Sequence, residues 1–244
     1  MIIKCTVAYD GYNYAGWQKQ ENALGIQTII EEALEKIQKS PVEIVASGRT
    51  DAHVHALGQV FHFQSEIAMQ PWQYVKAMNA LLPQDIRIQS AEIAPEDFHA
   101  RFSCKSKQYA YIATYDVTDP FAYRYKAPLY QKLDMEKMLE AAFYLIGEHD
   151  FTSFSSSRID ARKPRIKNVR LIEIRNKGKD VHFLFEGNGF LRYQVRMMTG
   201  TLIEVGKQKN PTIGCSTNAF GKKNKEVCRY NAPPQGLYLM KVRY

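Results

Sequence analysis

The chain has 244 residues, of which 45% are hydrophobic and 24% charged, a balance typical of a soluble globular protein with a sizeable core. No apolar run has the length that crosses a bilayer, and the first residues resemble a strand rather than a signal peptide. We therefore expect a cytoplasmic protein that makes no membrane contact. The four cysteines include no C-x-x-C pair, so we expect them to be reduced.

Charge is distributed unevenly along the chain. Residues 1–103 contain 8 Lys and Arg against 12 Asp and Glu, a net charge of −4, whereas residues 104–244 contain 25 against 13, a net charge of +12. A field this one-sided attracts polyanions. The chain also has 15 Tyr and 12 Phe, several beside basic residues, and this combination favours a nucleic acid as the partner.

Hydrophobic periodicity predicts the order β-α-β-β-α-β over residues 1–103. The expected elements are a strand over 2–9, a helix from Ile26 that ends before Pro41, strands over 42–46 and 59–63, a helix over 72–82 with Pro71 in its first turn, and a strand over 86–93. Between the first strand and the first helix, D-G-Y-N-Y-A-G-W-Q-K-Q-E-N is predicted to be a loop because it is rich in Gly and Asn.

Residues 104–244 repeat this order. The expected elements are a strand over 105–115, a helix capped by Asp134 that ends before Gly147, strands over 166–175 and 181–186 around a hairpin turn, a helix over 190–205 and a strand over 237–242. Two split β-α-β units predict an α/β (α+β) fold of two ferredoxin-like halves, 1–103 and 104–244, with a binding cleft between them. Insertions over 118–133, 151–164 and 207–236 contain many of the basic residues.

Residues 47–63, S-G-R-T-D-A-H-V-H-A-L-G-Q-V-F-H-F, gather titratable side chains between two apolar runs. Two chemistries fit. Either Asp51 is a lone carboxylate catalyst beside Arg49, or Asp51, His53 and His55 form a D-x-H-x-H metal cluster. A metal site needs a further ligand, and the chain has no second H-x-H or H-x-x-x-H motif. A third interpretation is that Asp51 only shapes the turn through hydrogen bonds to its own backbone.

Two other groups of residues have alternative roles. Arg192 and Arg196 lie four apart on one face of a predicted helix, and they point either into a cleft or to solvent. Tyr109 and Tyr111 share a strand face, which serves either core packing or the stacking of an unpaired base.

Six segments, in order along most of the chain, resemble the bacterial tRNA pseudouridine synthases of the TruA family. They are A-Y-D-G-Y-N-Y-A-G-W-Q at 8–18, G-R-T-D-A-H-V-H-A at 48–56 followed by G-Q-V, F-H-A-R-F-S at 98–103, K-Q-Y-A-Y at 107–111, D-F-T-S-F at 150–154 and G-F-L-R-Y-Q-V-R-M-M-T-G at 189–200. Two positions depart from the family. His53 replaces a Gly that indicates a tight backbone or a positive φ, and Gln194 replaces a residue that is usually apolar.

The resemblance implies two halves related by a pseudo-twofold axis, a homodimer, and no metal or organic cofactor. It implies that Asp51 is catalytic, that Tyr109 stacks on the flipped uracil, that Arg196 pairs with Asp51 and keeps it ionised, and that Arg49 helps to extrude the nucleotide. The implied substrates are uridines 38, 39 and 40 in the anticodon stem-loop of tRNA. The alternative hypotheses are a non-catalytic RNA-binding paralogue and a metal-dependent hydrolase.

Overall fold

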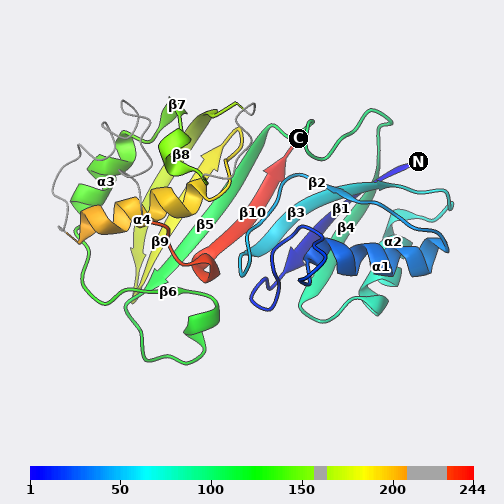
Figure 1. Ribbon diagram of the computed structural model, residues 1–244, viewed down its shortest axis with the longest axis horizontal. Coiled ribbons are helices and arrows are strands. Elements are labelled where there is room, and N and C mark those ends of the chain that lie inside the picture. Colours follow the sequence, from blue (N-terminus) through cyan, green and yellow to red (C-terminus); the bar gives the residue numbers. More distant parts are fainter. Residues whose placement is uncertain (157–163, 208–229) are drawn as a thin grey trace. The chain divides into compact units, whose positions relative to one another are not determined.

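The computed structural model describes residues 1–156, 164–207 and 230–244, and the chain forms two compact units (Figure 1). The first unit comprises Met1–Lys105 with Tyr238–Tyr244, and the second comprises Ser106–Leu237. The division lies two residues beyond the boundary expected after Ser103. The last strand, which the sequence analysis assigns to the second half, groups with the first unit because it pairs there with β3.

The first unit contains all six elements expected from its sequence. They are β1 (Ile2–Tyr9), α1 (Ile26–Gln38), β2 (Val45–Ala46), β3 (His55–Gln64), α2 (Pro71–Leu81) and β4 (Ile86–Ala94). The strand order β4-β1-β3-β2 is that of a ferredoxin-like unit, so the prediction for this half is confirmed. Strand β10 (Leu237–Arg243) adds to the same sheet, parallel to β3.

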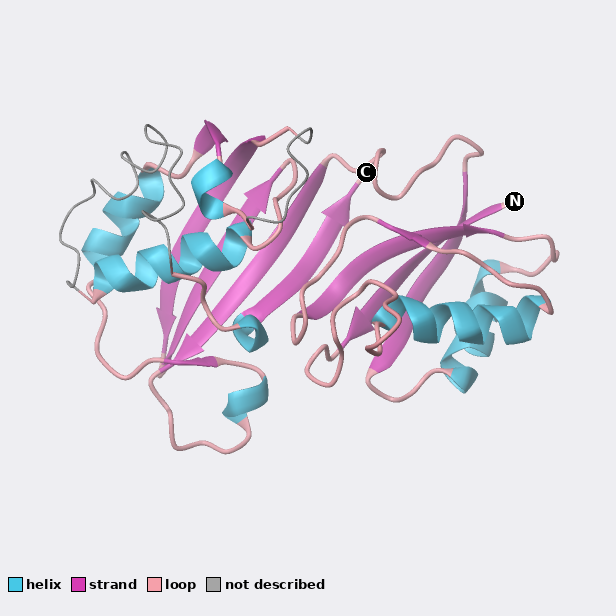
Figure 2. Ribbon diagram, viewed as in Figure 1, coloured by secondary structure: helices cyan, strands magenta, loops and turns pink. Residues whose placement is uncertain are grey.

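The core of the first unit follows directly from the apolar periodicity. In β1 every second side chain is buried, beginning at Ile3 and ending at Tyr9. Helix α1 buries Ile26, Ile30 and Leu34 completely, and α1 and α2 lie together on one side of the sheet (Figure 2). Each such side chain contributes about 1.5–3 kcal/mol relative to an exposed one. This packing fixes the ends of β1 and β3, from which the candidate site is built.

The second unit contains β5 (Ser106–Thr114), β6 (Ala127–Pro128), α3 (Met135–Phe143), β7 (Gly147–Asp150), β8 (Ile166–Lys177), β9 (Asp180–Gly187) and α4 (Gln194–Gly206), with short 3-10 turns at Ala122–Arg124, Thr152–Phe154 and Pro234–Gly236. Its strand order is β5-β9-β8-β7, and β6 pairs with β5. The short strands β6 and β7 were not expected. Helix α4 begins four residues later than predicted, because Tyr193 has φ 69° and cannot continue a right-handed helix.

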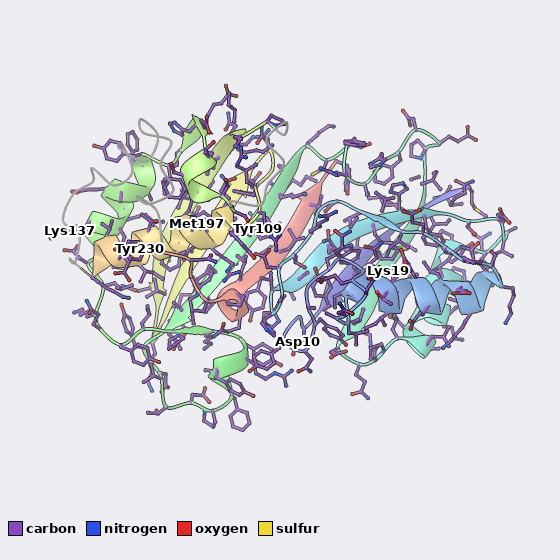
Figure 3. The ribbon with its side chains drawn as sticks, viewed as in Figure 1. Asp10, Lys19, Tyr109, Lys137, Met197 and Tyr230 are labelled. Atoms are coloured by element: carbon purple, nitrogen blue, oxygen red, sulfur yellow. The ribbon has the colours of Figure 1, made fainter. Side chains whose placement is uncertain are left out.

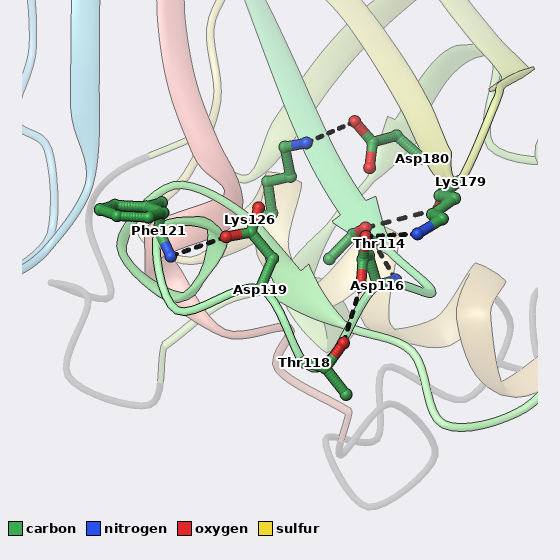
Figure 4. A network of polar contacts seen from close by, with 8 residues as sticks. All are labelled: Thr114, Asp116, Thr118, Asp119, Phe121, Lys126, Lys179 and Asp180. Atoms are coloured by element: carbon green, nitrogen blue, oxygen red, sulfur yellow. Dashed lines mark hydrogen bonds and ion pairs between the residues drawn. The ribbon is translucent and has the colours of Figure 1, made fainter.

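The connection between β5 and α3 is held by polar side-chain contacts (Figure 4). Asp116 pairs with Lys179 at 2.6 Å and accepts a hydrogen bond from Thr118 at 3.1 Å, while Lys126 pairs with Asp180 at 2.7 Å. The other two insertions are described only in part: G-K-K-N-K at 221–225 and the first two residues of R-K-P-R-I-K at 162–167 lie outside the described residues. In the described part of the chain, no helix is long and apolar enough to cross a membrane.

Candidate active site

Asp51 begins a tight turn between β2 and β3. The N–H of Val54 donates to the carbonyl of Asp51 at 3.2 Å, and of the two central residues only His53 has a positive φ, 64°. This is the geometry of a type II turn, whose third residue is normally Gly or Asn. The left-handed backbone that the resemblance indicates at position 53 is therefore present, at a cost of roughly 1–2 kcal/mol for a residue with a Cβ.

The loop after β1, residues 10–17, lies directly against this Asp51 turn (residues 51–54). The N–H of Trp17 donates to the carbonyl of Thr50 at 3.1 Å, and the N–H of His53 donates to the carbonyl of Tyr14 at 3.2 Å. The hydroxyls of Tyr9 and Thr50 share a hydrogen bond of 2.8 Å. The backbone of the Asp51 turn is thus hydrogen-bonded to the backbone of the 10–17 loop.

Two glycines make this close approach possible. A Cβ on Gly11 would lie 1.9 Å from the carbonyl oxygen of Val54, and a Cβ on Gly16 would lie 2.6 Å from that of Thr50. Gly16 also has φ 95°, which favours glycine. Their spacing in D-G-Y-N-Y-A-G-W was interpreted from the sequence only as a loop. In the structure these glycines are required because the 10–17 loop packs against residues 50–54 with no room for a side chain at either position.

His55 anchors the downstream end of the turn. Its ring is 2% exposed and stacks on Tyr238 of β10, with 4.8 Å between ring centroids. Its Nδ1 accepts the N–H of Gly11 at 3.1 Å and lies 3.0 Å from Oδ1 of Asp10, and the same Asp10 oxygen accepts the N–H of Tyr12 at 3.0 Å. The contacts with Asp10, Gly11 and Tyr238 hold the ring in one orientation.

The upstream end of the turn is held by Gln59, which is fully buried. The hydroxyl of Ser47 donates to its Oε1 at 2.7 Å, and its Nε2 donates to the carbonyl of Gly48 at 2.8 Å. Asp51 is partly buried between the two anchors, and Arg49 is exposed. The geometry presents one carboxylate on a fixed backbone.

The D-x-H-x-H metal hypothesis is not favoured by this geometry. His53 bonds through Nδ1 to the carbonyl of Tyr12, whereas Nδ1 of His55 faces Asp10. Within residues 1–156, 164–207 and 230–244, no group of three or more His, Cys, Asp or Glu side chains is arranged to hold a metal ion. The two histidines support the turn and the loop below it.

In the second unit, Tyr109 and Tyr111 of β5 have different environments. Tyr109 is 8% exposed and meets the ring of Phe190 edge to face, with centroids 5.3 Å apart. Tyr111 is fully buried and donates its hydroxyl to the carbonyl of Pro233 at 3.0 Å. Burial raises the pKa of the Tyr111 phenol, and the Arg196 guanidinium partly opposes this shift. Both tyrosines are buried, and Tyr109 is the less buried of the two; Figure 3 shows it on β5.

The two arginines expected on one helix face are not both in the helix: Arg196 lies in the first turn of α4, whereas Arg192 precedes it, because Tyr193 breaks the right-handed helix. The guanidinium carbons of Arg192 and Arg196 lie 4.9 Å and 5.3 Å from the ring centroid of Tyr193. Arg192 is exposed, whereas Arg196 is half-buried and donates from Nε to the carbonyl of Ala232 at 2.8 Å. Gln194, the second departure from the family pattern, is fully buried, and its Oε1 accepts the N–H of Leu191 at 2.8 Å. The amide thus bonds to the chain just before the helix.

A split β-α-β fold and a carboxylate on a doubly anchored turn define an α/β protein built around one fixed acid group. Residues 6–103 and 141–244 match the family model for tRNA pseudouridine synthase. The chain belongs to this family. It is 45% identical to a tRNA pseudouridine synthase A of an Exiguobacterium species, over 99% of this chain and 97% of that protein. The enzyme of the same name from Bacillus pumilus is 43% identical, over 100% and 99%.

As a member of this family the chain is an isomerase that converts uridine to pseudouridine in tRNA, and neither a pure binding module nor a hydrolase is favoured. A solved structure, a Cbf5-Nop10-Gar1 complex, also matches at a TM-score of 0.41 and 12% identity, over 97% of this chain and 57% of that one. A likeness this weak leaves the fold assignment to the strand order and the family match.

Proposed function

We propose that this chain forms pseudouridine at positions 38, 39 and 40 of the tRNA anticodon stem-loop, with Asp51 as its essential carboxylate. The observation that supports this most is the Asp51 turn, which is anchored by Gln59 upstream and by His55 downstream. Hydrogen bonds that fix the backbone on both sides of Asp51 suit a side chain that must be positioned within a fraction of an ångström of a reacting atom.

The reaction itself needs a carboxylate and a flipped base. The bond between N1 and C1′ breaks, the uracil rotates, and a bond between C5 and C1′ forms, so substrate and product are isomers. An ionised Asp51 is suited to act as nucleophile or base in this sequence. Removing the base from its stack costs a few kcal/mol, and stacking on an aromatic ring returns about 1–3 kcal/mol.

Three further residues are proposed to bind the substrate. Tyr109 offers the stacking surface, and its ring is already oriented by Phe190. Arg49 is exposed two residues before Asp51 and suits a phosphate contact during extrusion of the nucleotide. Arg196 supplies a cation that keeps the Asp51 carboxyl ionised, because an opposite charge nearby favours the charged form. No metal or organic cofactor enters this scheme.

We further propose that the protein acts as a cytoplasmic homodimer on tRNA and makes no membrane contact. The net charge of +12 over residues 104–244 suits a phosphate backbone. Sedimentation velocity at micromolar concentration checks the dimer: we expect about twice the mass of one 28.1 kDa chain. A single monomer species would contradict it.

The decisive experiment replaces Asp51 by Asn, which keeps the shape of the side chain and removes its charge. We expect pseudouridine formation to fall by about 10⁴-fold or more, with tRNA affinity within about threefold of the wild type. Asp97→Asn, at an exposed carboxylate of the same unit, is the matched control and should retain full activity.

The readout is pseudouridine mapping on tRNA transcripts in which uridines 38, 39 and 40 are replaced one at a time by cytidine. Turnover that survives in both Asp51→Asn and Asp51→Ala would exclude Asp51 as the essential group. Modification at other positions would revise the substrate and leave the role of Asp51 intact.

A further inference from the structure

His53 is the exposed side chain of the Asp51 turn, and the main-chain hydrogen bonds of the turn form without its ring. Its φ of 64° places it where a type II turn favours Gly or Asn. The backbone N–H of His53 already bonds to Tyr14, so the turn is tied to the 10–17 loop by main chain alone. A residue with a Cβ that adopts an unfavourable conformation at a proposed functional site points to a use for its side chain.

The imidazole is oriented by one hydrogen bond. Its Nδ1 contacts the carbonyl of Tyr12, and a carbonyl only accepts, so the proton of the neutral ring lies on Nδ1. Nε2 is then an acceptor, and becomes a donor when the ring is charged. The ring is exposed, and in the part of the chain that the structure describes only Tyr12 bonds to it. The fixed ring therefore offers Nε2 to an external group.

We propose that His53 is an RNA-contacting residue, whose Nε2 binds the sugar–phosphate backbone of a nucleotide beside the target uridine. This inference rests on the proposed function, because it takes the Asp51 turn as the place where that uridine is held. His53 is two residues from Asp51 on a turn of four residues, so a nucleotide that reaches the carboxylate brings its neighbour to the imidazole. The RNA backbone supplies both matching groups: a phosphate for the charged ring and a 2′-hydroxyl for the neutral one.

The competing explanation is that His53 serves only to bond the carbonyl of Tyr12. The two explanations differ in the variant His53→Gly, which suits the positive φ and removes the ring. If the ring were only structural, the variant would change thermal stability and leave RNA binding alone. If the ring contacts RNA, the variant is at least as stable as the wild type but binds RNA more weakly.

The experiment measures the melting temperature, and the Kd and KM for an anticodon stem-loop, in full-length wild type and three variants. For His53→Gly we expect an unchanged or higher melting temperature, with Kd and KM raised roughly 3- to 10-fold, the value of one hydrogen bond. His53→Asn tolerates the same backbone but has a shorter side chain, so it should bind like the Gly variant. His53→Arg retains the reach of the side chain and offers donors to a phosphate or a 2′-hydroxyl, so it should bind within about twofold of the wild type.

Two modified stem-loops identify the RNA group. A 2′-deoxy substitution beside the target should remove the difference between wild type and His53→Gly if the hydroxyl is bound, and a methylphosphonate should do so if the phosphate is bound. Equal Kd and KM in wild type and His53→Gly would overturn the inference, as would a difference that neither modification removes.

The outcome is separable from that of the proposed function. If Asp51→Asn abolishes turnover while His53→Gly binds normally, the enzyme assignment stands and only the His53 contact fails. If wild-type protein makes no pseudouridine, the function fails whatever the His53 variants do.

Discussion

The two units differ in the connection between two paired antiparallel strands, β2 and β3 in the first unit and β8 and β9 in the second. In the first unit residues 47–54 join β2 to β3, carry Asp51 and are bonded to a second loop. In the second unit only Gly178 and Lys179 join β8 to β9, and Gly178, with φ 61°, forms the turn that the sequence predicts as a hairpin. The comparison teaches that paired strands can be joined by a bare two-residue turn or by a longer loop held from both sides, and the proposed site uses the second kind.

The largest effect should come from a methyl group added against the Asp51 turn, at Gly11, and it is compared with a methyl group added to the β8–β9 turn, at Gly178. Gly11→Ala places a Cβ 1.9 Å from the carbonyl oxygen of Val54, so one of the two loops must move. We expect a loss of about 3 kcal/mol or more in the free energy of unfolding, measured by urea denaturation. Gly178→Ala meets no atom within 4 Å and should lose only about 1 kcal/mol, the cost of its left-handed backbone. Equal losses would mean that the two connections are equally tolerant.

A smaller effect, on rate rather than folding, should follow from Asp10→Asn. This change removes the carboxylate that orients His55 while keeping the side chain's shape. We expect kcat to fall by about 10- to 100-fold with KM within about twofold, because a slight displacement of the Asp51 turn weakens alignment without removing an RNA contact. Steady-state kinetics on the stem-loop provides the measurement.

The matched control for Asp10→Asn is Asp116→Asn. Asp116 pairs with Lys179 on the surface of the second unit, outside the proposed site. Its loss should leave kcat unchanged. A rise in KM for Asp10→Asn with kcat preserved would show that Asp10 serves binding and does not position the turn.

The smallest expected effect is a loss of stability in mild acid, and it should be greater in the first unit. Burial lowers the pKa of His62 from its ordinary value of 6.5, and the neighbouring His99 lowers it further. Its Nδ1 accepts the N–H of Ala100 at 3.1 Å, a bond that a charged ring cannot accept. The unfolded chain therefore binds a proton that the folded chain resists, so stability is full above pH 6.5 and falls as the pH drops below it.

Thermal melting between pH 7.5 and 5.0 checks this prediction. His62→Gln should flatten the pH dependence, because an amide accepts the same N–H without titrating. His182 of β9 also has a lowered pKa, through burial and Lys177, but it is less buried than His62. His182→Gln should therefore flatten the curve less, and the reverse order would contradict the account.

Local pattern was sufficient for most elements. The bounds of β1 follow from strict alternation, and helix α2 begins at Pro71, as proline at a first turn indicates. Strand β3 begins at His55, four residues earlier than expected, because its first residues pair with β10. A strand whose partner lies far away in the chain gives little local signal.

The sequence predicts the centre of the candidate site, Asp51, but not the contacts that hold it. Asp51 stands in a motif that the sequence shows, and the positive φ at His53 agrees with the Gly of the family. The sequence does not predict the pairing of His55 with Asp10. From the sequence, His55 is a candidate metal ligand and Asp10 is only part of a loop. That contact joins residues 45 positions apart, and it exists only after β1 and β3 have paired.

The stacking of Tyr238 on His55 has a consequence for protein synthesis. Residues 238 and 239 pair with residues 55 and 56. Strand β3, which contains His55, can therefore pair with β10 only after the ribosome has made the end of the chain. A nascent chain can form β1, α1 and the Asp51 turn early, but the ring of His55 gains its stacking partner only when β10 emerges. An interrupted translation product would thus contain the Asp51 turn but lack the ring that packs on His55.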